Sequence, residues 1–143
     1  MKAALLVESL TGHTWKAAEL IAENLTQEGW TITGLQALRQ PDHRAIQSAD
    51  IVLVGTWVHG AFIIGQAPWN IGAIRSLPAL AGKKAATFCT FALNPGRTLD
   101  AMDRAVTGLG ADVIGGLALH RAKLELHCET FTDRLCSALN LPA

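Results

Sequence analysis

The sequence predicts a doubly wound α/β domain, in which helices cover both faces of a parallel sheet. Short apolar runs without polar alternation recur along the chain, a pattern typical of parallel strands that are buried on both faces. Between these runs lie segments whose apolar residues recur every three or four positions, as in amphipathic helices. Strands and helices that alternate in this way over 143 residues indicate one domain, residues 1–143, with a five-stranded sheet.

The first half of the chain supplies three of the expected strands. Lys2–Val7 and Ile51–Gly55 are nearly continuous apolar runs, so both are interpreted as buried strands. Between them, Ile21 and Leu25 lie on one stripe of a helix that Gly29 ends. The elements expected in this half are, in order, a strand at Lys2–Val7, a helix at Thr14–Glu28, a strand at Trp30–Leu35, a short helix at Pro41–Ser48, a strand at Ile51–Gly55 and a helix at Trp69–Leu77.

The second half continues the alternation with two further strands. Leu99, Met102 and Val106 recur at helical spacing, and Gly110 is placed to end that helix. Right-handed crossovers, together with a ligand-binding turn after the first strand, favour the strand order 2-1-3-4-5. The elements expected in this half are a strand at Ala85–Phe91, a helix at Thr98–Leu109, a strand at Asp112–His120 and a closing helix at His127–Leu139.

The charge and hydropathy of the chain exclude several functional classes. Formal net charge is zero at pH 7, whereas proteins that neutralise nucleic-acid phosphates are basic, so no nucleic-acid partner is expected. Half of the residues are apolar, which excludes a disordered chain. Residues 51–74 carry no charged side chain, but several glycines and Pro68 interrupt them, so we expect a buried strand and an uncharged loop and no membrane span.

The three cysteines do not suggest a disulfide framework. Their odd number favours a reducing compartment, and no N-terminal signal pattern precedes the first strand, so a cytoplasmic protein is expected. His120, His127, Cys128 and Cys136 do not match the spacing of zinc ligands, and no metal is assigned.

The turn Ser9–Thr14 is the most informative segment of the chain. It follows the first strand and opens the first helix, whose initial backbone N–H groups lack internal partners and carry partial positive charge. Ser9, Thr11 and Thr14 add hydroxyl donors, and Gly12 allows close approach of a ligand to the backbone. No lysine or arginine lies in these residues, so the turn predicts a phosphate site built mainly from neutral donors. Serine, threonine and glycine also cap ordinary helices, and a plain helix cap is the alternative interpretation.

The pattern Ser9-x-Thr11-Gly12-x-Thr14 after the first strand resembles the FMN-phosphate loop of flavodoxins. His13 stands where that family usually has asparagine. A second motif, Leu77–Lys84 followed by Phe88, resembles the flavodoxin run in which a helix ends, a Gly-Lys turn follows and the fourth strand begins. The resemblance covers nearly the whole chain and lacks the long insertion of long-chain members. It implies a short-chain form with non-covalent FMN, whose phosphate would be bound by Ser9, Leu10, Thr11, Gly12, His13 and Thr14.

The resemblance also implies which residues contact the flavin ring. Trp57 matches the aromatic residue that many flavodoxins place against the ring. The chain has no tyrosine, and Thr90–Arg97 carries no carboxylate, so this loop departs from the acidic, tyrosine-bearing loop of the family. Phe91 would take the aromatic role there, or it is plain core, and Asn94 or backbone amides would bond the pyrimidine edge. The expected ring contacts are Thr56, Trp57, Val58, His59, Gly60, Thr90, Phe91, Ala92 and Asn94.

One residue and one segment of this region, His59 and Gly60–Trp69, allow more than one interpretation. His59 would donate a hydrogen bond near the redox nitrogen, or it is a solvated loop histidine. The segment Gly60–Trp69 is unusually apolar for a loop. It either folds back onto the core or provides a contact for a homodimer, a redox partner or a hydrophobic acceptor.

Two functions follow from these observations. The first is an FMN-binding redox protein, either an electron carrier for a partner protein or a small oxidoreductase that reduces a small-molecule acceptor. The second is a module of the same fold that has lost FMN and serves in binding or assembly. Other doubly wound families are excluded by their own residues, because the chain has no Gly-x-Gly-x-x-Gly turn and no P-loop, and a Cys-x5-Arg loop starting at Cys89 would meet Pro95 in place of arginine.

The charge around the predicted flavin site leads to one further expectation. The three loops Ser9–Thr14, Thr56–Gly65 and Thr90–Arg97 contain no aspartate or glutamate, and Arg97 lies close to them in sequence. Carboxylates around a flavin disfavour its anionic reduced form. We therefore expect a less negative reduction potential than in acidic flavodoxins.

Overall fold

The computed structural model describes residues 1–9, 12–59 and 67–139. The elements run, in order, β1 (Lys2–Val7), α1 (His13–Gln27), β2 (Thr31–Ala37), α2 (His43–Ser48), β3 (Ile51–His59), β4 (Ala67–Pro68), α3 (Ile71–Arg75), β5 (Lys84–Phe91), α4 (Thr98–Gly108), β6 (Asp112–His120), a 3₁₀ turn (Arg121–Lys123) and α5 (Leu124–Ala138). None of the helices in these ranges is long and apolar enough to cross a bilayer.

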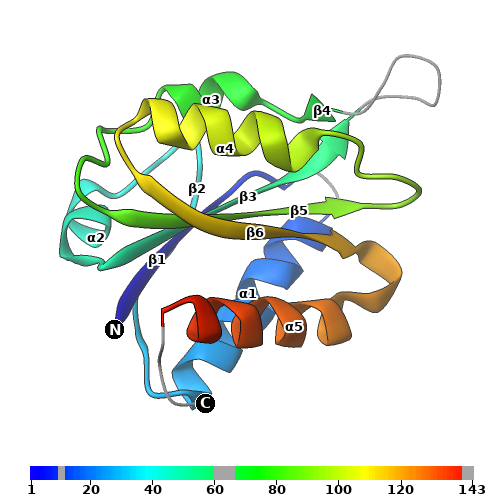
Figure 1. The fold of residues 1–143 in the computed structure, drawn as a ribbon, viewed down its shortest axis with the longest axis horizontal. Helices are drawn as coiled ribbons and strands as arrows, with labels where there is room; N and C mark the ends of the chain where they lie inside the picture. Colours follow the sequence, from blue (N-terminus) through cyan, green and yellow to red (C-terminus); the bar gives the residue numbers. More distant parts are fainter. Residues whose placement is uncertain (10–11, 60–66, 140–143) are drawn as a thin grey trace.

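The five long strands form one parallel sheet in the order β2-β1-β3-β5-β6. Counted by the long strands alone, this is the predicted order 2-1-3-4-5, and the doubly wound fold is confirmed. The short strand β4 is an addition that pairs antiparallel with the end of β3. Helices α1 and α5 pack together below the sheet in the view of Figure 1, whereas α3 and α4 lie above it.

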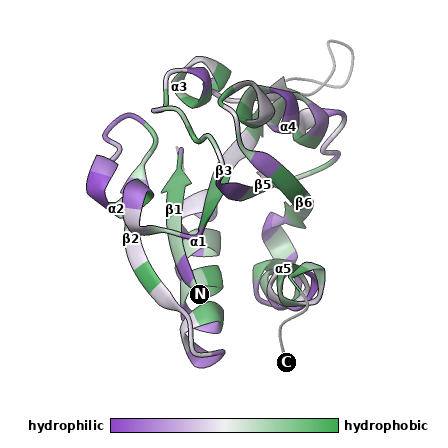
Figure 2. Cartoon of the chain, turned by 60° about the vertical axis from the view of Figure 1, so that its left-hand side comes forward, coloured by the Kyte–Doolittle hydropathy of each residue, from purple (hydrophilic) through white to green (hydrophobic). Residues whose placement is uncertain are grey.

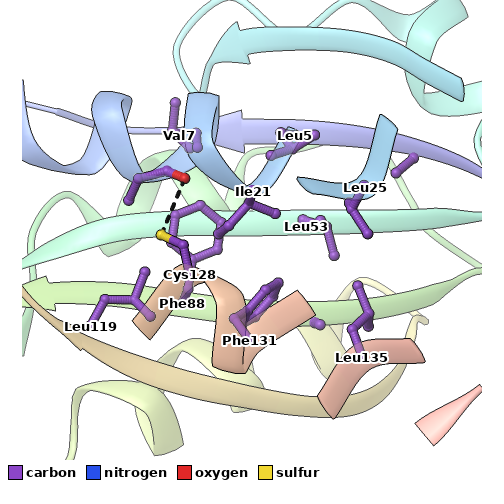
Figure 3. Close-up of a cluster of buried hydrophobic side chains, with 14 of the residues drawn as sticks. Leu5, Val7, Ile21, Leu25, Leu53, Phe88, Leu119, Cys128, Phe131 and Leu135 are labelled. Carbon is purple, nitrogen blue, oxygen red and sulfur yellow. Dashed lines mark hydrogen bonds between the residues drawn. The ribbon is translucent and has the colours of Figure 1, made fainter. Parts of the chain in front are cut away.

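The core between the sheet and the α1–α5 pair is built from every second residue of the central strands. Leu5 of β1, Leu53 of β3 and Phe88 of β5 point to this side, as Figure 3 shows. Ile21 of α1 and Phe131 of α5 pack against them, and the Phe131 ring meets the Phe88 ring edge-on, with 5.7 Å between centroids. Burial of large apolar side chains contributes about 1.5–3 kcal/mol each, so this layer is a major source of stability.

The opposite face of the same strands forms a second core. Leu6, Val54 and Cys89 alternate with the residues of the first core and pack against Ile74 of α3 and Met102 of α4. In Figure 2 β1 is mostly hydrophobic, whereas α5, seen nearly end-on, shows mixed colouring, as expected for an amphipathic helix. Burial on both faces explains why the strand sequences show no polar alternation.

Strand β3 is longer than the sequence predicts, because it continues through Gly55 to His59 where a loop was expected from Thr56. Gly55 is paired in the parallel sheet, with Val7 on one side and Phe88 on the other. A Cβ at Gly55 would lie 2.2 Å from the Phe88 ring, so this glycine is required by close packing and does not end the strand.

The helices that differ most from their predicted bounds are α3 and α5. Helix α3 spans only Ile71–Arg75, so Trp69 lies outside it. Helix α5 begins at Leu124, three residues before the predicted start at His127, and the 3₁₀ turn leads directly into it. This earlier start places the turn against the carboxyl edge of the sheet, where the candidate site lies.

Candidate functional site

Ser9 and Gly12 shape the start of α1, just beyond the carboxyl end of β1. The Ser9 hydroxyl oxygen accepts hydrogen bonds from the backbone N–H groups of Gly12, at 3.1 Å, and of Trp15, at 3.3 Å. Gly12 is the N-cap residue with φ of 90°, a left-handed conformation that favours glycine. No described atom lies within 4 Å of where its Cβ would be, so a ligand can approach this backbone. Leu10 and Thr11 lie outside the described residues.

Thr14 and Thr90 join the first helix to β5 through one buried hydrogen bond. Their hydroxyl oxygens lie 2.8 Å apart, and the two residues are 1% and 3% exposed. Both were predicted to contact the cofactor. The structure shows that each hydroxyl is engaged by the other, which fixes the start of α1 against the end of β5.

The ends of β3 and β4 form a short antiparallel ladder at the same edge. The Trp69 N–H donates to the Trp57 carbonyl at 2.9 Å, and the fully buried Thr56 hydroxyl donates to the Trp69 carbonyl at 2.9 Å. The Trp57 and Trp69 rings stack, with centroids 5.0 Å apart and planes at 23°. The described end of the apolar segment therefore folds back onto β3. Residues 60–66, including Gly60, lie outside the described part of the chain, and so does most of the segment predicted to contact another subunit.

A pocket of about 180 Å³ lies where these elements meet. It lies at the carboxyl edge of the sheet, beside the ends of β3 and β5, the edge at which ligands of doubly wound proteins bind. Its lining residues come from α1, β3, β5, the following loop and the 3₁₀ turn: His13, Trp57, Val58, Thr90, Phe91, Ala92 and Arg121.

The structure thus brings together six residues that the sequence predicted to contact the cofactor, and adds Arg121. Leu10, Thr11 and Gly60 lie outside the described residues, and the other predicted residues are not among those that line this pocket. Ser9 supports the α1 turn, Thr56 supports the β3–β4 ladder, and the Asn94 side-chain oxygen accepts a hydrogen bond from the Gly96 N–H at 2.9 Å. The His59 backbone pairs with Ala67 at the end of β3.

Two histidines hold the turn that carries Arg121. The His120 ring meets the Phe91 ring edge-on, with centroids 5.0 Å apart. The His120 N–H donates to His127 Nδ1 at 2.9 Å, and the Ala122 N–H donates to His120 Nδ1 at 3.1 Å. Arg121 was not predicted to lie at the site, although its place after β6, at the carboxyl edge of the sheet, was a usable signal.

A carboxylate and a thiol at this edge of the sheet are each held in an unreactive state. Glu8 precedes the α1 turn, and its carboxylate forms an ion pair with Arg39 at 2.8 Å. Burial raises the pKa of the Cys89 thiol to about 12, so this cysteine is protonated at neutral pH and is not a nucleophile. No cluster of three or more metal-ligating side chains occurs in residues 1–9, 12–59 and 67–139.

Comparison with known proteins gives a consistent result. A family model described as "Flavodoxin domain" matches residues 4–105. A cysteine-to-serine variant of the flavodoxin from Pseudomonas aeruginosa is 21% identical, with a TM-score of 0.72 over 98% of this chain and 99% of that one. Oxidised flavodoxin 1 from Bacillus cereus is also 21% identical, with a TM-score of 0.70 over 96% and 98% of the two chains.

A third similar structure is the two-electron reduced flavodoxin of Megasphaera elsdenii, which is 19% identical with a TM-score of 0.68 over 89% of this chain and 98% of that one. At these identities the structural likeness establishes the fold alone. A search of curated proteins gave no match.

Proposed function

The chain belongs to the flavodoxin family, and on that premise we propose that it binds FMN non-covalently and works as an electron-transfer protein. The observation that carries this proposal is the pocket between Trp57 and Phe91, which lies beside the start of α1. Two aromatic residues in the lining and the positive end of a helix nearby suit a ligand with a flat ring and a phosphate.

At the phosphate end, the first turn of α1 would hold the anion. Gly12 leaves its backbone open, and the helix dipole favours negative charge at this point. Ser9 is committed to fixing the turn, so its contribution is to position the donors. His13 lies at the junction between this turn and the pocket.

At the ring end, Trp57 and Phe91 would bind and orient the flavin. The stack with Trp69 fixes the Trp57 ring, and the contact with His120 fixes the Phe91 ring. FMN supplies the redox chemistry, because it accepts and releases electrons one or two at a time. Arg121 borders the pocket and would favour a negatively charged ligand.

Flavodoxins transfer electrons to partner proteins, and we propose this role here, with reduction of a small-molecule acceptor as the alternative. The free, buried cysteines suit a reducing compartment, which supports the proposed cytoplasmic location.

A homodimer through residues 60–69 stays a prediction. Sedimentation of the purified protein would test it.

A binding titration tests the cofactor. Adding the protein to FMN should quench the flavin fluorescence with a Kd in the micromolar range or below, and riboflavin, which lacks the phosphate, should bind at least about tenfold more weakly. Trp57→Leu should weaken FMN binding, whereas Trp30→Phe, at the other end of the sheet, should not. If wild-type protein binds no FMN, the fold serves another purpose, and a binding or assembly module becomes the better hypothesis.

A further inference from the structure

A second, larger hollow adjoins the pocket and differs from it in chemistry. It is an open groove of about 680 Å³ between the start of α1 and the start of α5. It shares His13 and Arg121 with the pocket, so the two are continuous. Its other lining residues are Lys16, Ala122, Lys123, Leu124, Glu125, Leu126 and Glu129.

The groove is basic at the end that meets the pocket. Lys16, Arg121 and Lys123 are all exposed, and none of them forms an ion pair within the described residues. The acidic residues Glu125 and Glu129 line the same groove, and Glu129 also borders a separate hollow further along α1 and α5. The groove therefore carries three basic and two acidic residues, and the basic Arg121 is the charged residue that it shares with the pocket.

Exposed apolar side chains lie at the same surface. Among the described residues only three large apolar side chains are exposed: Met1, Leu93 and Leu126. Leu126, 59% exposed, lines the groove, and Leu93, 71% exposed, directly follows the pocket residues Phe91 and Ala92. Exposed apolar side chains beside charged ones are typical of protein docking surfaces, whereas a small anion would need no apolar contact.

We propose that this surface, defined as Lys16, Arg121, Lys123, Leu93 and Leu126, docks an acidic electron-transfer protein. The inference rests on the proposed redox function, because it names the kind of partner that meets the flavin. Carboxylates of the partner face the three basic residues, while Leu93 and Leu126 supply apolar contacts beside the pocket. The three basic residues give this docking surface the opposite charge to that of a carrier that surrounds its flavin with carboxylates. Such carriers and this protein therefore select different partners.

Nuclear magnetic resonance titration of the ¹⁵N-labelled protein tests the proposal, with and without FMN. The probes are two electron-transfer proteins of opposite charge, an acidic plant-type ferredoxin and a basic mitochondrial cytochrome c. The ferredoxin should shift the amide signals of residues 121–126 and of Leu93, and its Kd should rise about tenfold or more between about 20 and about 200 mM NaCl. Cytochrome c should leave these signals unchanged.

Matched charge reversals locate the interaction. Lys16→Glu/Lys123→Glu should weaken ferredoxin binding about tenfold or more. The control Lys2→Glu/Lys84→Glu makes the same change in net charge at the amino ends of β1 and β5, on the opposite edge of the sheet, and should alter the Kd less than about twofold. Leu126→Ser should weaken binding without changing its salt dependence.

Several outcomes would overturn the proposal. It fails if the ferredoxin makes no contact at low salt, or if cytochrome c binds equally well at the same residues. It also fails if the groove variant and the control variant weaken binding equally. If inorganic phosphate causes the same shifts as the ferredoxin, the groove is a small-anion site. Lys16 and Lys123 do not line the pocket, so their replacement leaves the pocket lining unchanged. The FMN affinity of each variant is therefore measured separately from its ferredoxin affinity. FMN binding without ferredoxin contact sinks only this proposal, whereas loss of FMN binding in the wild type sinks the proposed function.

Discussion

At the scale of single residues, Thr14 and Thr90 join two sides of the pocket by one buried hydrogen bond of 2.8 Å. Thr14→Val alone leaves the Thr90 hydroxyl buried without that partner, which costs about 1–3 kcal/mol in the free energy of unfolding. The double variant Thr14→Val/Thr90→Val removes both hydroxyls and should cost less than the sum of the two single variants. Urea unfolding of the four proteins measures this coupling, and strictly additive effects would contradict it.

The buried thiols make a prediction about pH. Burial raises the pKa of the Cys89 thiol from 9.0 to about 12, and that of Cys128 also to about 12. Below pH 9 each thiol is protonated in both the folded and the unfolded chain, so its contribution to stability is constant. Above that pH the unfolded chain releases a proton that the folded chain keeps, and stability falls by up to about 1.4 kcal/mol per pH unit for each thiol.

Cys89→Ala isolates this effect for one thiol. The variant loses packing at every pH, but its free energy of unfolding should decline less steeply than that of the wild type between about pH 9.5 and about pH 11. Denaturant unfolding across this range supplies the comparison. Parallel pH profiles for the two proteins would show that the thiol does not titrate as burial requires.

Arg121 shows why one site residue escaped prediction. The resemblance to the family points to three loops, Ser9–Thr14, Thr56–Gly65 and Thr90–Arg97, and Arg121 lies in none of these loops. It reaches the pocket because α5 starts earlier than its apolar spacing suggests and because two histidine acceptors fix the preceding turn. Those contacts depend on packing between β6 and α5, which a single sequence does not reveal.

At the scale of secondary-structure elements, the start of α1 depends on the conformation of Gly12. Its φ of 90° is costly for other residues, by roughly 1–2 kcal/mol, although the space around its Cβ position is open. Gly12→Ala should therefore lower the free energy of unfolding by about that amount and weaken FMN binding. Gly12→Asn should be milder on stability, because asparagine tolerates the left-handed region. Equal stability of all three proteins in urea would mean that the turn relaxes without strain.

Strand β3 shows where element prediction fails. The apolar run Ile51–Val54 predicts a buried strand, and Gly55 then looks like its end. In the folded chain Gly55 instead makes room for the Phe88 ring on the neighbouring strand. A glycine needed for close packing and a glycine needed for a turn are identical in sequence, so the extension to His59 and the ladder with β4 were not predictable.

At the scale of the whole molecule, the fold was predictable because its signals repeat. The central strands β1, β3 and β5 carry apolar runs that are buried on both faces, the long helices each bury an apolar stripe, and their alternation leaves few allowed topologies. The main part of the site was predictable for the same reason, since the carboxyl ends of β1, β3 and β5 must converge at the switch point. The side-chain partners within the site follow from tertiary packing, and sequence patterns do not specify them.

The overall charge distribution sets the last prediction, which concerns the reduction potential of bound FMN. The formal net charge is zero, no carboxylate occurs in the three predicted flavin loops, and Arg121 borders the pocket. These features stabilise an anionic reduced flavin, so its potential should be less negative than in acidic flavodoxins. Arg121→Gln should make it more negative by on the order of 1 kcal/mol, about 40 mV for one electron. Arg104→Gln on α4, across the sheet, is the matched control and should leave the potential unchanged. A spectroscopic redox titration at low salt measures both variants, and equal potentials in wild type and Arg121→Gln would show that this arginine does not act on the flavin.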